Sequence, residues 1–402
     1  MNPKSFMLIA GEASGDTLAA ELVSALSAQS STLNSLAQRS EAETAPSAPV
    51  FFGAGGPEMA DAGVELAFDL TKHSVIGVAD AAKNYFKFRR LFNQLLTLAI
   101  ERKPDVVIGV DFSGFNLRFG HAIKQYVRDN PFSKWEPKII QFVSPQVWAS
   151  RPGRAKRLAA DYDLVLSIFP FEKDWYAQRA PKLRVEYVGH PMMGRFDPVG
   201  TRCSASVDAR QRIPAILLLP GSRADELRRH LPVMLTALKQ IREKLPAAKV
   251  KMILPNPASK ELAATLIVTT ANVEIQIGDL PQALAETDLA IASTGTVTME
   301  CAFFGVPTVT LYKTSWLNWE IAKHIATVKW ATMPNILADE EIFPEFIQSA
   351  ATPENIAGAA LRLLQDESRC AHIKKRLAEI VSTLGEPGAG ARAATAILGL
   401  FN

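Results

Sequence analysis

The chain has 402 residues, with 44 Lys or Arg against 41 Asp or Glu, so its formal net charge is +3. This balance gives no reason to expect a nucleic-acid partner, although a local basic patch could still meet an anionic surface. The length exceeds what one hydrophobic core usually supports, which predicts two domains. Three widely spaced cysteines form neither a metal cluster nor a disulfide framework and favour a reducing compartment. The first apolar run is too short for a signal peptide, and no apolar stretch reaches the roughly 18 residues of a membrane span.

Short apolar segments alternate with helical patterns over the first half of the chain. Strands are expected at 5–10, 50–53, 105–110, 138–143, 164–168 and 185–188, with helices at 17–28, 58–62, 74–103 and 117–128. Residues 27–49, rich in Ser, Ala, Glu, Gln and Pro, predict a helix end followed by a loop. Apolar strands separated by helices predict a parallel sheet with helices on both faces. This domain is expected to span residues 1–192.

A second alternating series follows a stretch without periodicity at 193–214, which we interpret as a linker. Strands are expected at 215–219, 250–254, 273–277, 289–292 and 307–311, with helices between them, and residues 352–383 and 386–401 look helical. We predict a second doubly wound domain at 215–350. The helices of 351–402 are expected to pack on the first domain or on a partner subunit.

Two acidic positions in the first half lie at the carboxyl ends of strands, where ligands bind in doubly wound sheets. One is Asp111, directly after DVVIGV, where partial desolvation would raise the pKa towards that of a general base. The other is the turn GEASGD, which offers Glu12 and Asp16 on a flexible loop. The alternative for Asp111 is a cap on the next helix. A glycine cluster after the second strand is only weak support for dinucleotide binding, because G-x-G-x-x-G is missing.

The second half contains a strand, a small polar turn and a helix at 289–304, in which the turn reads Ser293-Thr294-Gly295-Thr296. Unpaired N–H groups and the helix dipole at such a turn suit a phosphate or diphosphate, and Glu300 could accept hydrogen bonds from a ribose diol. An ordinary capped helix is the alternative. The turn Pro220–Arg223 adds backbone N–H groups and one guanidinium, which favours bidentate contact with phosphate.

Three further features have both a functional and a structural interpretation. His190, beside the predicted linker, is expected where two domains would face each other, although a lone histidine is as often structural. Asp161-Tyr162-Asp163 matches the D-x-D pattern of metal-dependent sugar-nucleotide enzymes but precedes its strand, so we predict no metal. The segments 83–92 and 315–329 combine aromatic and basic residues, which is typical either of a membrane interface or of a helix with one core face.

The motifs together give a resemblance that covers nearly the whole chain. They are AGEASGD (10–16), the glycine turn at 53–59, DFSGFNLR (111–118), SPQVWASRPGR (144–154), FPFE (169–172), VGHP (188–191), LPGSR (219–223), STGT with its glutamate (293–300) and MPNILA (333–338). In this order they resemble the lipid-A-disaccharide synthases, the inverting glycosyltransferases of lipid A biosynthesis. The 27–49 loop and the GAGGPEM turn depart from that pattern, and neither touches the donor motifs.

The resemblance implies two facing Rossmann-like domains of the glycosyltransferase-B type, which work without cofactor or metal. It implies UDP-2,3-diacylglucosamine as donor, 2,3-diacylglucosamine 1-phosphate as acceptor, and a cytoplasmic enzyme peripherally associated with the inner membrane. Asp111 would be the base, and the other two expected catalytic residues, Glu12 and Asp16, would with Ser14 order the acceptor sugar or its phosphate. The expected donor residues are Gly221, Ser222, Arg223, Ser293, Gly295, Thr296 and Glu300. The expected acceptor or cleft residues are Ser14, Gly15, Asn116, His190 and Asn335, and the expected acyl or membrane residues are Tyr85, Phe86, Phe88, Arg89 and Phe92.

Two other functions fit some of the same residues. A UDP-sugar epimerase of the same architecture would share Arg223 and the 293–300 site but has no use for an aromatic-basic helix. A non-catalytic nucleotide binder at a membrane surface would not depend on Asp111. The oligomeric state is left open by the sequence.

Overall fold

The computed structural model describes residues 5–38, 48–73, 85–195, 213–267 and 273–401. Most of the predicted linker, the start of the predicted helix 74–103 and residues 39–47 of the predicted loop lie outside these ranges. The chain forms two compact units. Unit 1 combines Met1–Arg195 with Leu384–Asn402, and unit 2 is Phe196–Thr383.

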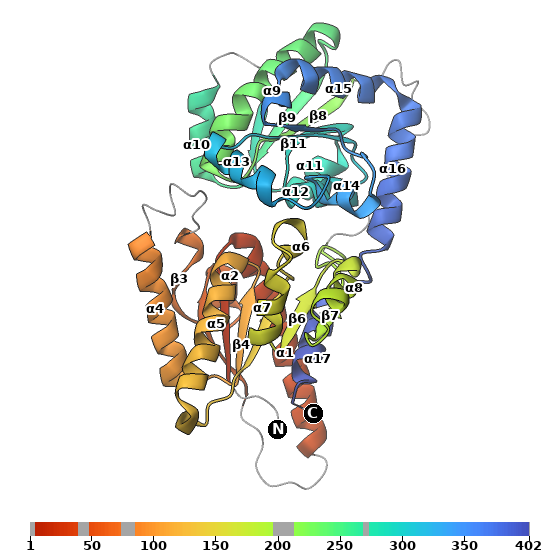
Figure 1. Ribbon diagram of the computed structural model, residues 1–402. Helices are drawn as coiled ribbons and strands as arrows, with labels where there is room; N and C mark the ends of the chain where they lie inside the picture. The colour runs from red at the N-terminus through yellow and green to blue at the C-terminus, as the bar shows by residue number, and fades with distance from the viewer. Residues whose placement is uncertain (1–4, 39–47, 74–84, 196–212, 268–272, 402) are drawn as a thin grey trace. The chain divides into compact units, whose positions relative to one another are not determined.

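Unit 1 is built on a seven-stranded parallel sheet with the order β3-β2-β1-β4-β5-β6-β7. The strands are β1 (Ser5–Ala10), β2 (Val50–Gly55), β3 (Glu65–Asp69), β4 (Val106–Val110), β5 (Lys138–Phe142), β6 (Leu164–Ser167) and β7 (Val185–Tyr187). The helices are α1 (Ala13–Gln38), α2 (Pro57–Asp61), α4 (Tyr85–Arg102), α5 (Ser113–Asp129), α6 (Val147–Ser150), α7 (Arg154–Asp161), α8 (Pro170–Arg179) and α17 (Ala389–Leu398). Short 3-10 turns are η1 (Thr71–His73) and η2 (Pro131–Ser133). Figure 1 shows helices on both faces of this sheet, as expected for parallel strands that are apolar on both sides.

Unit 2 repeats the design with a six-stranded parallel sheet in the order β10-β9-β8-β11-β12-β13. Its strands are β8 (Ala215–Leu219), β9 (Lys249–Leu254), β10 (Glu274–Ile277), β11 (Leu289–Ser293), β12 (Thr308–Tyr312) and β13 (Glu345–Ile347). Its helices are α9 (Ala224–Lys244), α10 (Pro257–Leu266), α11 (Leu280–Ala285), α12 (Val297–Phe303), α13 (Trp316–Ile325), α14 (Met333–Ala338), α15 (Pro353–Gln365) and α16 (Glu367–Ser382), with the 3-10 turn η4 (Gln348–Ala350).

Each sheet reverses its strand order at one point, and these two points position the candidate sites. In unit 1 the reversal lies between β1 and β4, and in unit 2 it lies between β8 and β11. The connections leave such a pair of strands in opposite directions, which opens a crevice at the carboxyl ends. All four strands are almost completely buried, so a polar group that follows them emerges at the edge of an apolar core.

Three expectations differ from the structure. Helix α1 continues to Gln38, ten residues beyond the predicted helix end at residue 28, and β3 was not expected at all. The C-terminal helices do not act as one group, because α15 and α16 complete the core of unit 2. Only α17 returns to unit 1, where it packs on α1 and Arg392 Nε donates to the Val188 carbonyl at 2.7 Å.

Candidate functional site

The carboxyl ends of β1 and β4 meet in unit 1. Ala10 pairs with Val110 at the last rung, so the turn after β1 lies against the turn after β4. A Cβ at Gly15 would come within 3.6 Å of the Asp111 Cβ, and one at Gly11 would strike the Phe112 ring at 2.3 Å. Gly11 therefore leaves the space that the Phe112 ring occupies, whereas a side chain at Gly15 would only make ordinary contact with the Asp111 turn. Around them Asp111 and Glu12 are half-buried and Ser14 is exposed, so these side chains are open to a ligand.

Asp111 has a constrained backbone. Asp111 and Phe112 are consecutive left-handed residues with φ of 49° and 39°, a conformation that side chains disfavour. Two buried amides hold it in place: Asn116 Nδ2 and Gln141 Nε2 each donate to the Asp111 carbonyl at 2.9 Å. Gly109 makes room for both, since a Cβ there would lie 2.8 Å from each amide. Asn116 was expected to touch the acceptor, but it is 2% exposed and instead positions Asp111.

Gln141 was not identified from the sequence. It lies within β5. In a strand, the alternation of polar and apolar residues does not tell a polar residue that supports a site from one that faces solvent. Its amide also donates to the Phe142 and Val143 carbonyls at 3.3 Å, and Val143 is itself left-handed with φ of 64°. A single side chain thus ties the end of β5 to the turn that carries Asp111.

The SPQVWASRPGR and FPFE segments are joined by a buried carboxylate. Glu172 Oε1 accepts a hydrogen bond from Trp148 Nε1 at 2.9 Å, and its Oε2 accepts from the Phe169 N–H at 3.2 Å. Burial raises the pKa of Glu172 to about 7, although these donors favour the charged form. The contact anchors α6 to the start of α8, and so fixes the loop after β5.

Asp16 does not belong to the open part of the site. Its Oδ1 accepts from the Gly56 and Met59 N–H groups at 2.7 and 3.2 Å, and its Oδ2 accepts from the Glu58 N–H at 3.0 Å. The side chain is 2% exposed. The expected catalytic role is therefore wrong: Asp16 satisfies the unpaired N–H groups at the start of α2, as a helix cap supplied from another helix.

His190 is likewise structural. It is 7% exposed, its ring packs against Phe169, and its Nδ1 accepts from the Met192 N–H at 3.2 Å, so Nε2 carries the proton of the neutral ring. Burial, and secondarily Arg195, lowers its pKa to about 4. Its own N–H donates to the Leu384 carbonyl at 2.8 Å. Within unit 1 the returning C-terminal segment thus contacts the backbone of His190, and the buried ring has a structural role.

In unit 2 the turn after β8 lies beside the end of β11, since Leu219 pairs with Ala292. Gly221 has φ of 117°, and a Cβ there would contact the Glu226 carboxylate at 2.5 Å. Arg223 caps α9 from an extended conformation, and its Nη1 lies 3.4 Å from Glu226 Oε1. The guanidinium is 38% exposed and Ser222 is exposed, so the turn presents a cation and a hydroxyl to solvent.

A buried histidine supports this turn and was missed in the sequence. His230 is fully buried in α9, where its spacing matches the apolar face of the helix. Its Nε2 accepts from the Lys313 N–H at 3.0 Å, so Nδ1 carries the proton and donates to the Pro220 carbonyl at 2.8 Å. Burial lowers its pKa and keeps the ring neutral. The histidine joins the end of β12 to the turn that carries Arg223.

The third turn of unit 2 follows β11. Ser293 is 3% exposed, whereas Gly295 and Thr296 are exposed and a Cβ at Gly295 would meet open space. The φ of Gly295 is 151°, and its carbonyl accepts from Thr298 Oγ1 at 2.7 Å. Helix α12 starts immediately afterwards, with the half-buried Glu300 in its first turn. The structure thus brings the Ser222–Arg223 and Gly295–Thr296 turns to one sheet edge.

Asn335 was also expected at a cleft, and the structure contradicts this. It is fully buried, with Oδ1 accepting from the Ile342 and Phe343 N–H groups at 2.9 and 2.8 Å. Its Nδ2 donates to the Phe343 carbonyl and to Glu345 Oε1, both at 2.8 Å. Every hydrogen-bonding position of the amide is used to hold the segment before β13.

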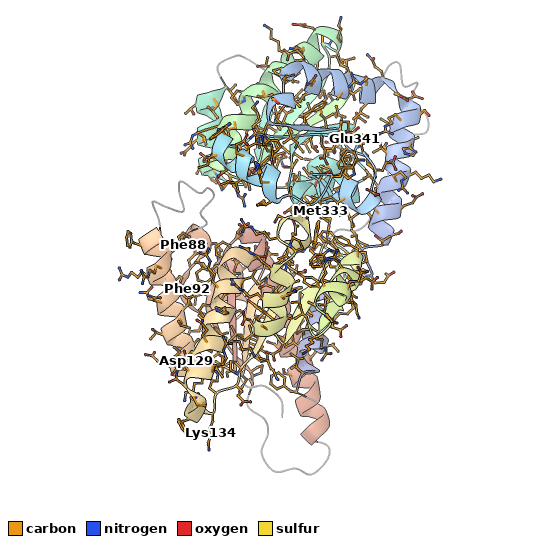
Figure 2. All side chains as sticks on the ribbon, in the orientation of Figure 1. Phe88, Phe92, Asp129, Lys134, Met333 and Glu341 are labelled. Atoms are coloured by element: carbon orange, nitrogen blue, oxygen red, sulfur yellow. The ribbon has the colours of Figure 1, made fainter. Side chains whose placement is uncertain are left out.

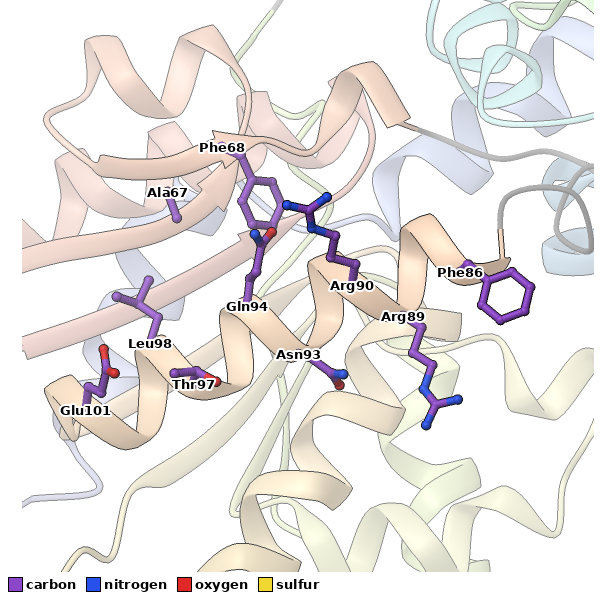
Figure 3. A pocket seen from close by; sticks show the side chains of 10 residues that line it. All are labelled: Ala67, Phe68, Phe86, Arg89, Arg90, Asn93, Gln94, Thr97, Leu98 and Glu101. Carbon is purple, nitrogen blue, oxygen red and sulfur yellow. The ribbon is translucent and has the colours of Figure 1, made fainter.

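The aromatic residues of α4 divide between two environments. Phe88 and Phe92, labelled on α4 in Figure 2, are half-buried and pack against the core of unit 1. Phe92 makes edge contacts with the rings of Phe115 and Phe119. Phe86 is 79% exposed, and the structure does not describe the side chain of Tyr85. A groove of about 870 Å³ lies between α4 and β3, and Figure 3 shows the side chains that line it. It is lined by Ala67, Phe68, Phe86, Arg89, Arg90, Asn93, Gln94, Thr97, Leu98 and Glu101.

The D-x-D pair is engaged in ion pairs at the amino end of β6. Asp161 Oδ2 lies 2.8 Å from His121 Nδ1, and Asp163 Oδ2 lies 3.1 Å from Lys124 Nζ. Among the described residues, no group of three or more His, Cys, Asp or Glu side chains is arranged to hold a metal ion. Within the same ranges, none of the helices combines the length and hydrophobicity needed to cross a bilayer.

Comparison with known proteins identifies both the fold and the family. MurG from Acinetobacter baumannii covers 99% of this chain and 100% of its own at 16% identity, with a TM-score of 0.52. The UDP co-structure of S. aureus MnaA covers 99% and 97% at 13% identity, with a TM-score of 0.60. The family model for lipid-A-disaccharide synthetase matches residues 6–398. The lipid-A-disaccharide synthase of Trichlorobacter lovleyi is 34% identical over 403 residues, covering 99% of this chain and 98% of that protein.

Two parallel α/β units, each with polar turns at its strand reversal, define a glycosyltransferase-B fold, as the sequence predicted. The chain belongs to the lipid-A-disaccharide synthetase family, so it is a glycosyltransferase of lipid A biosynthesis.

Proposed function

We propose that the enzyme transfers 2,3-diacylglucosamine from UDP-2,3-diacylglucosamine to the 6-hydroxyl of 2,3-diacylglucosamine 1-phosphate. The products are the β-1,6-linked disaccharide 1-phosphate and UDP, formed with inversion by a single displacement. Family membership supports this reaction. The observation that carries the mechanism is the Asp111 carboxylate, which stands on a strained turn at the strand reversal of unit 1 and is held there by two buried amides.

In this reaction Asp111 accepts the proton of the acceptor hydroxyl while the hydroxyl oxygen bonds to the anomeric carbon of the donor. The bond between that carbon and the diphosphate oxygen breaks, and both electrons leave with UDP. A general base in such a position typically contributes two to four orders of magnitude. Glu12, Ser14 and Gly15, which border the same turn, would contact the acceptor sugar.

The leaving diphosphate needs positive charge and N–H donors as it departs. Arg223 and Ser222 on one turn, with Ser293, Gly295 and Thr296 on the other, offer these groups at one edge of unit 2. Gly221 allows the first turn to form, and Glu300 would accept from the ribose hydroxyls. We propose that these groups replace a divalent cation, so activity should persist in EDTA. A requirement for added Mg²⁺ would refute that part of the proposal.

The test of the reaction is Asp111→Asn, assayed with both diacylated sugars by mass spectrometry of the lipid product. We expect turnover to fall by roughly two to four orders of magnitude, with UDP affinity retained. Asp129→Asn is the matched control, because Asp129 is an exposed acid at the far end of α5 (Figure 2). Normal turnover in Asp111→Asn would remove the base from the mechanism. Consumption of UDP-sugar without a lipid acceptor would instead favour an epimerase.

We also propose that unit 1 contacts the cytoplasmic face of the inner membrane through the start of α4. The exposed Phe86 ring beside Arg89 and Arg90 supports this, because an aromatic ring flanked by cations suits an anionic headgroup interface. Phe86→Ser should reduce co-sedimentation with anionic vesicles, whereas Phe132→Ser, 96% exposed at the opposite end of the unit, should not. Equal binding by both variants would contradict the proposal.

A further inference from the structure

Helices α5 and α7 lie side by side and balance their charges over part of their length. The Tyr162 hydroxyl donates to the Asn116 carbonyl at 2.6 Å, and Gly120 leaves room for that ring. At the carboxyl end of α7, Asp161 pairs with His121 and Asp163 pairs with Lys124, both partners lying in the middle of α5. In this part of the interface a basic residue of α5 therefore faces an acid, Asp161 at the last position of α7 and Asp163 just after it.

The balance ends one helical turn closer to the amino ends. Arg118 is one turn before His121, Arg157 is one turn before Asp161, and Arg154 and Arg151 continue the series. Partial burial, and secondarily the charges of Arg151, Arg118 and Arg157, lower the pKa of Arg154, which places these three guanidinium groups near it. Among the described residues, none of these four guanidinium groups forms an ion pair with a carboxylate.

This arrangement is unfavourable in the absence of an anion. Like charges repel, and the first turn of α7 places Arg154, Lys156 and Arg157 at the end of the helix that carries the positive dipole. Four guanidinium groups offer planar, paired donors that fit the oxygens of a phosphate. The cluster is also at the correct end of the unit, because α5 begins directly after Asp111. Arg118 follows Asp111 by two turns, a rise of about 10 Å.

We propose that Arg118, Arg151, Arg154 and Arg157 bind the phosphate monoester of the acceptor, while its hydroxyl lies at Asp111. This inference rests on the proposed function, since it requires an acceptor that carries a sugar phosphate. The phosphate on C1 and the reacting hydroxyl on C6 are attached on the two sides of the ring oxygen, so one acceptor sugar would present the first group to the cluster and the second to the base. The same donors could instead hold phospholipid headgroups of a bilayer, and the experiment separates the two sources.

The experiment compares Arg151→Gln/Arg154→Gln with Lys156→Gln, a control that removes one cation from the same helix outside this group. The acceptor is a short-chain monosaccharide 1-phosphate in solution, and its dephosphorylated analogue is the second substrate. We expect the double variant to raise the acceptor KM by 10- to 100-fold and to lose most of the preference for the phosphorylated acceptor. UDP affinity, measured by calorimetry, should match the wild type. Arg154→Lys, which keeps the charge without the planar fork, should give an intermediate KM, and thermal melting confirms folding.

Three outcomes would overturn the inference. One is an unchanged acceptor KM and phosphate preference in the double variant. Another is a wild type that does not distinguish the two acceptors. The third is a loss of co-sedimentation with anionic vesicles while the KM for the short-chain acceptor in solution is unchanged, which assigns the cluster to bilayer headgroups. A wild type that transfers no sugar to either acceptor would instead contradict the proposed function itself.

Discussion

Asp16 offers a direct test of the distinction between a catalytic carboxylate and a structural one. Asp16→Ala removes the acceptor of three backbone N–H groups at the start of α2 and leaves them buried. A buried donor without a partner costs about 1–3 kcal/mol. Because water can enter the space left by the side chain, we expect a total of about 3–5 kcal/mol. For a unit of roughly 200 residues, this lowers Tm by about 10 °C.

Asp16→Asn removes only one of the three hydrogen bonds that Asp16 accepts. The amide oxygen can still accept from the Gly56 and Met59 N–H groups, but its NH₂ group faces the Glu58 N–H, so one bond is replaced by a contact between donors. We expect a loss of about 2 kcal/mol, smaller than for Asp16→Ala.

The assay is thermal unfolding combined with initial rates at a temperature where both variants are folded. A structural Asp16 predicts a graded loss of Tm, with kcat and both KM values of the folded enzyme within about two-fold of the wild type. A kcat lowered by a factor of 100 at normal Tm would refute the reasoning and return Asp16 to the active site.

Further predictions concern Arg223, Gln141 and His190. Arg223→Ala should weaken UDP binding by about 1.5–3 kcal/mol, whereas Arg228→Ala, an exposed neighbour on α9, should not; equal calorimetric affinities would contradict the assignment. Gln141→Leu should lower kcat by about 10-fold with little change in donor KM, and an effect confined to Tm would make Gln141 merely structural. The pKa of His190 is about 4 in the folded state against about 6.5 when unfolded, so its contribution is complete above pH 6.5. Up to about 3 kcal/mol should be lost as pH falls from 6.5 to 4. His190→Asn, which keeps an acceptor for the Met192 N–H, should flatten that dependence of Tm on pH.

The strands and the positions of the turns could be predicted because they depend on local patterns. A buried parallel strand reads as an apolar run, and a polar residue directly after it must emerge at the sheet edge, as Asp111 and Arg223 do. Strand β3 was missed since its burial is only partial and its sequence, ELAFD, alternates weakly between two charged ends. Helix α1 was shortened because serines and glutamines disfavour a helix only weakly.

The roles of individual polar residues could not be predicted in the same way. Asp16 and Asp111 both follow buried strands, yet the partners of Asp16 are N–H groups about 40 residues away in sequence, at the start of α2. His190 lies in a turn and Asn335 in the short helix α14, and both are held by backbone contacts: His190 N–H donates to the Leu384 carbonyl, and the Asn335 amide bonds to the segment just after its own helix. A short motif predicts that a polar side chain has a specific partner. It does not predict whether that partner is a ligand or the protein's own backbone.

The two units use different residues to stabilise the turn at the strand reversal. A reacting group at a strand reversal must stand on a turn whose backbone leaves the sheet abruptly, and such turns are intrinsically unfavourable. In unit 2 glycine at 221 and 295 removes most of the steric penalty. In unit 1 the turn carries a side chain that the proposed reaction requires, so glycine cannot replace Asp111, and the strain must be offset by contacts. The Asn116 and Gln141 amides on its carbonyl supply them. It follows that substitutions at these two amides should disturb catalysis more than their distance from any substrate suggests, whereas substitutions around Gly295 should act through nucleotide affinity.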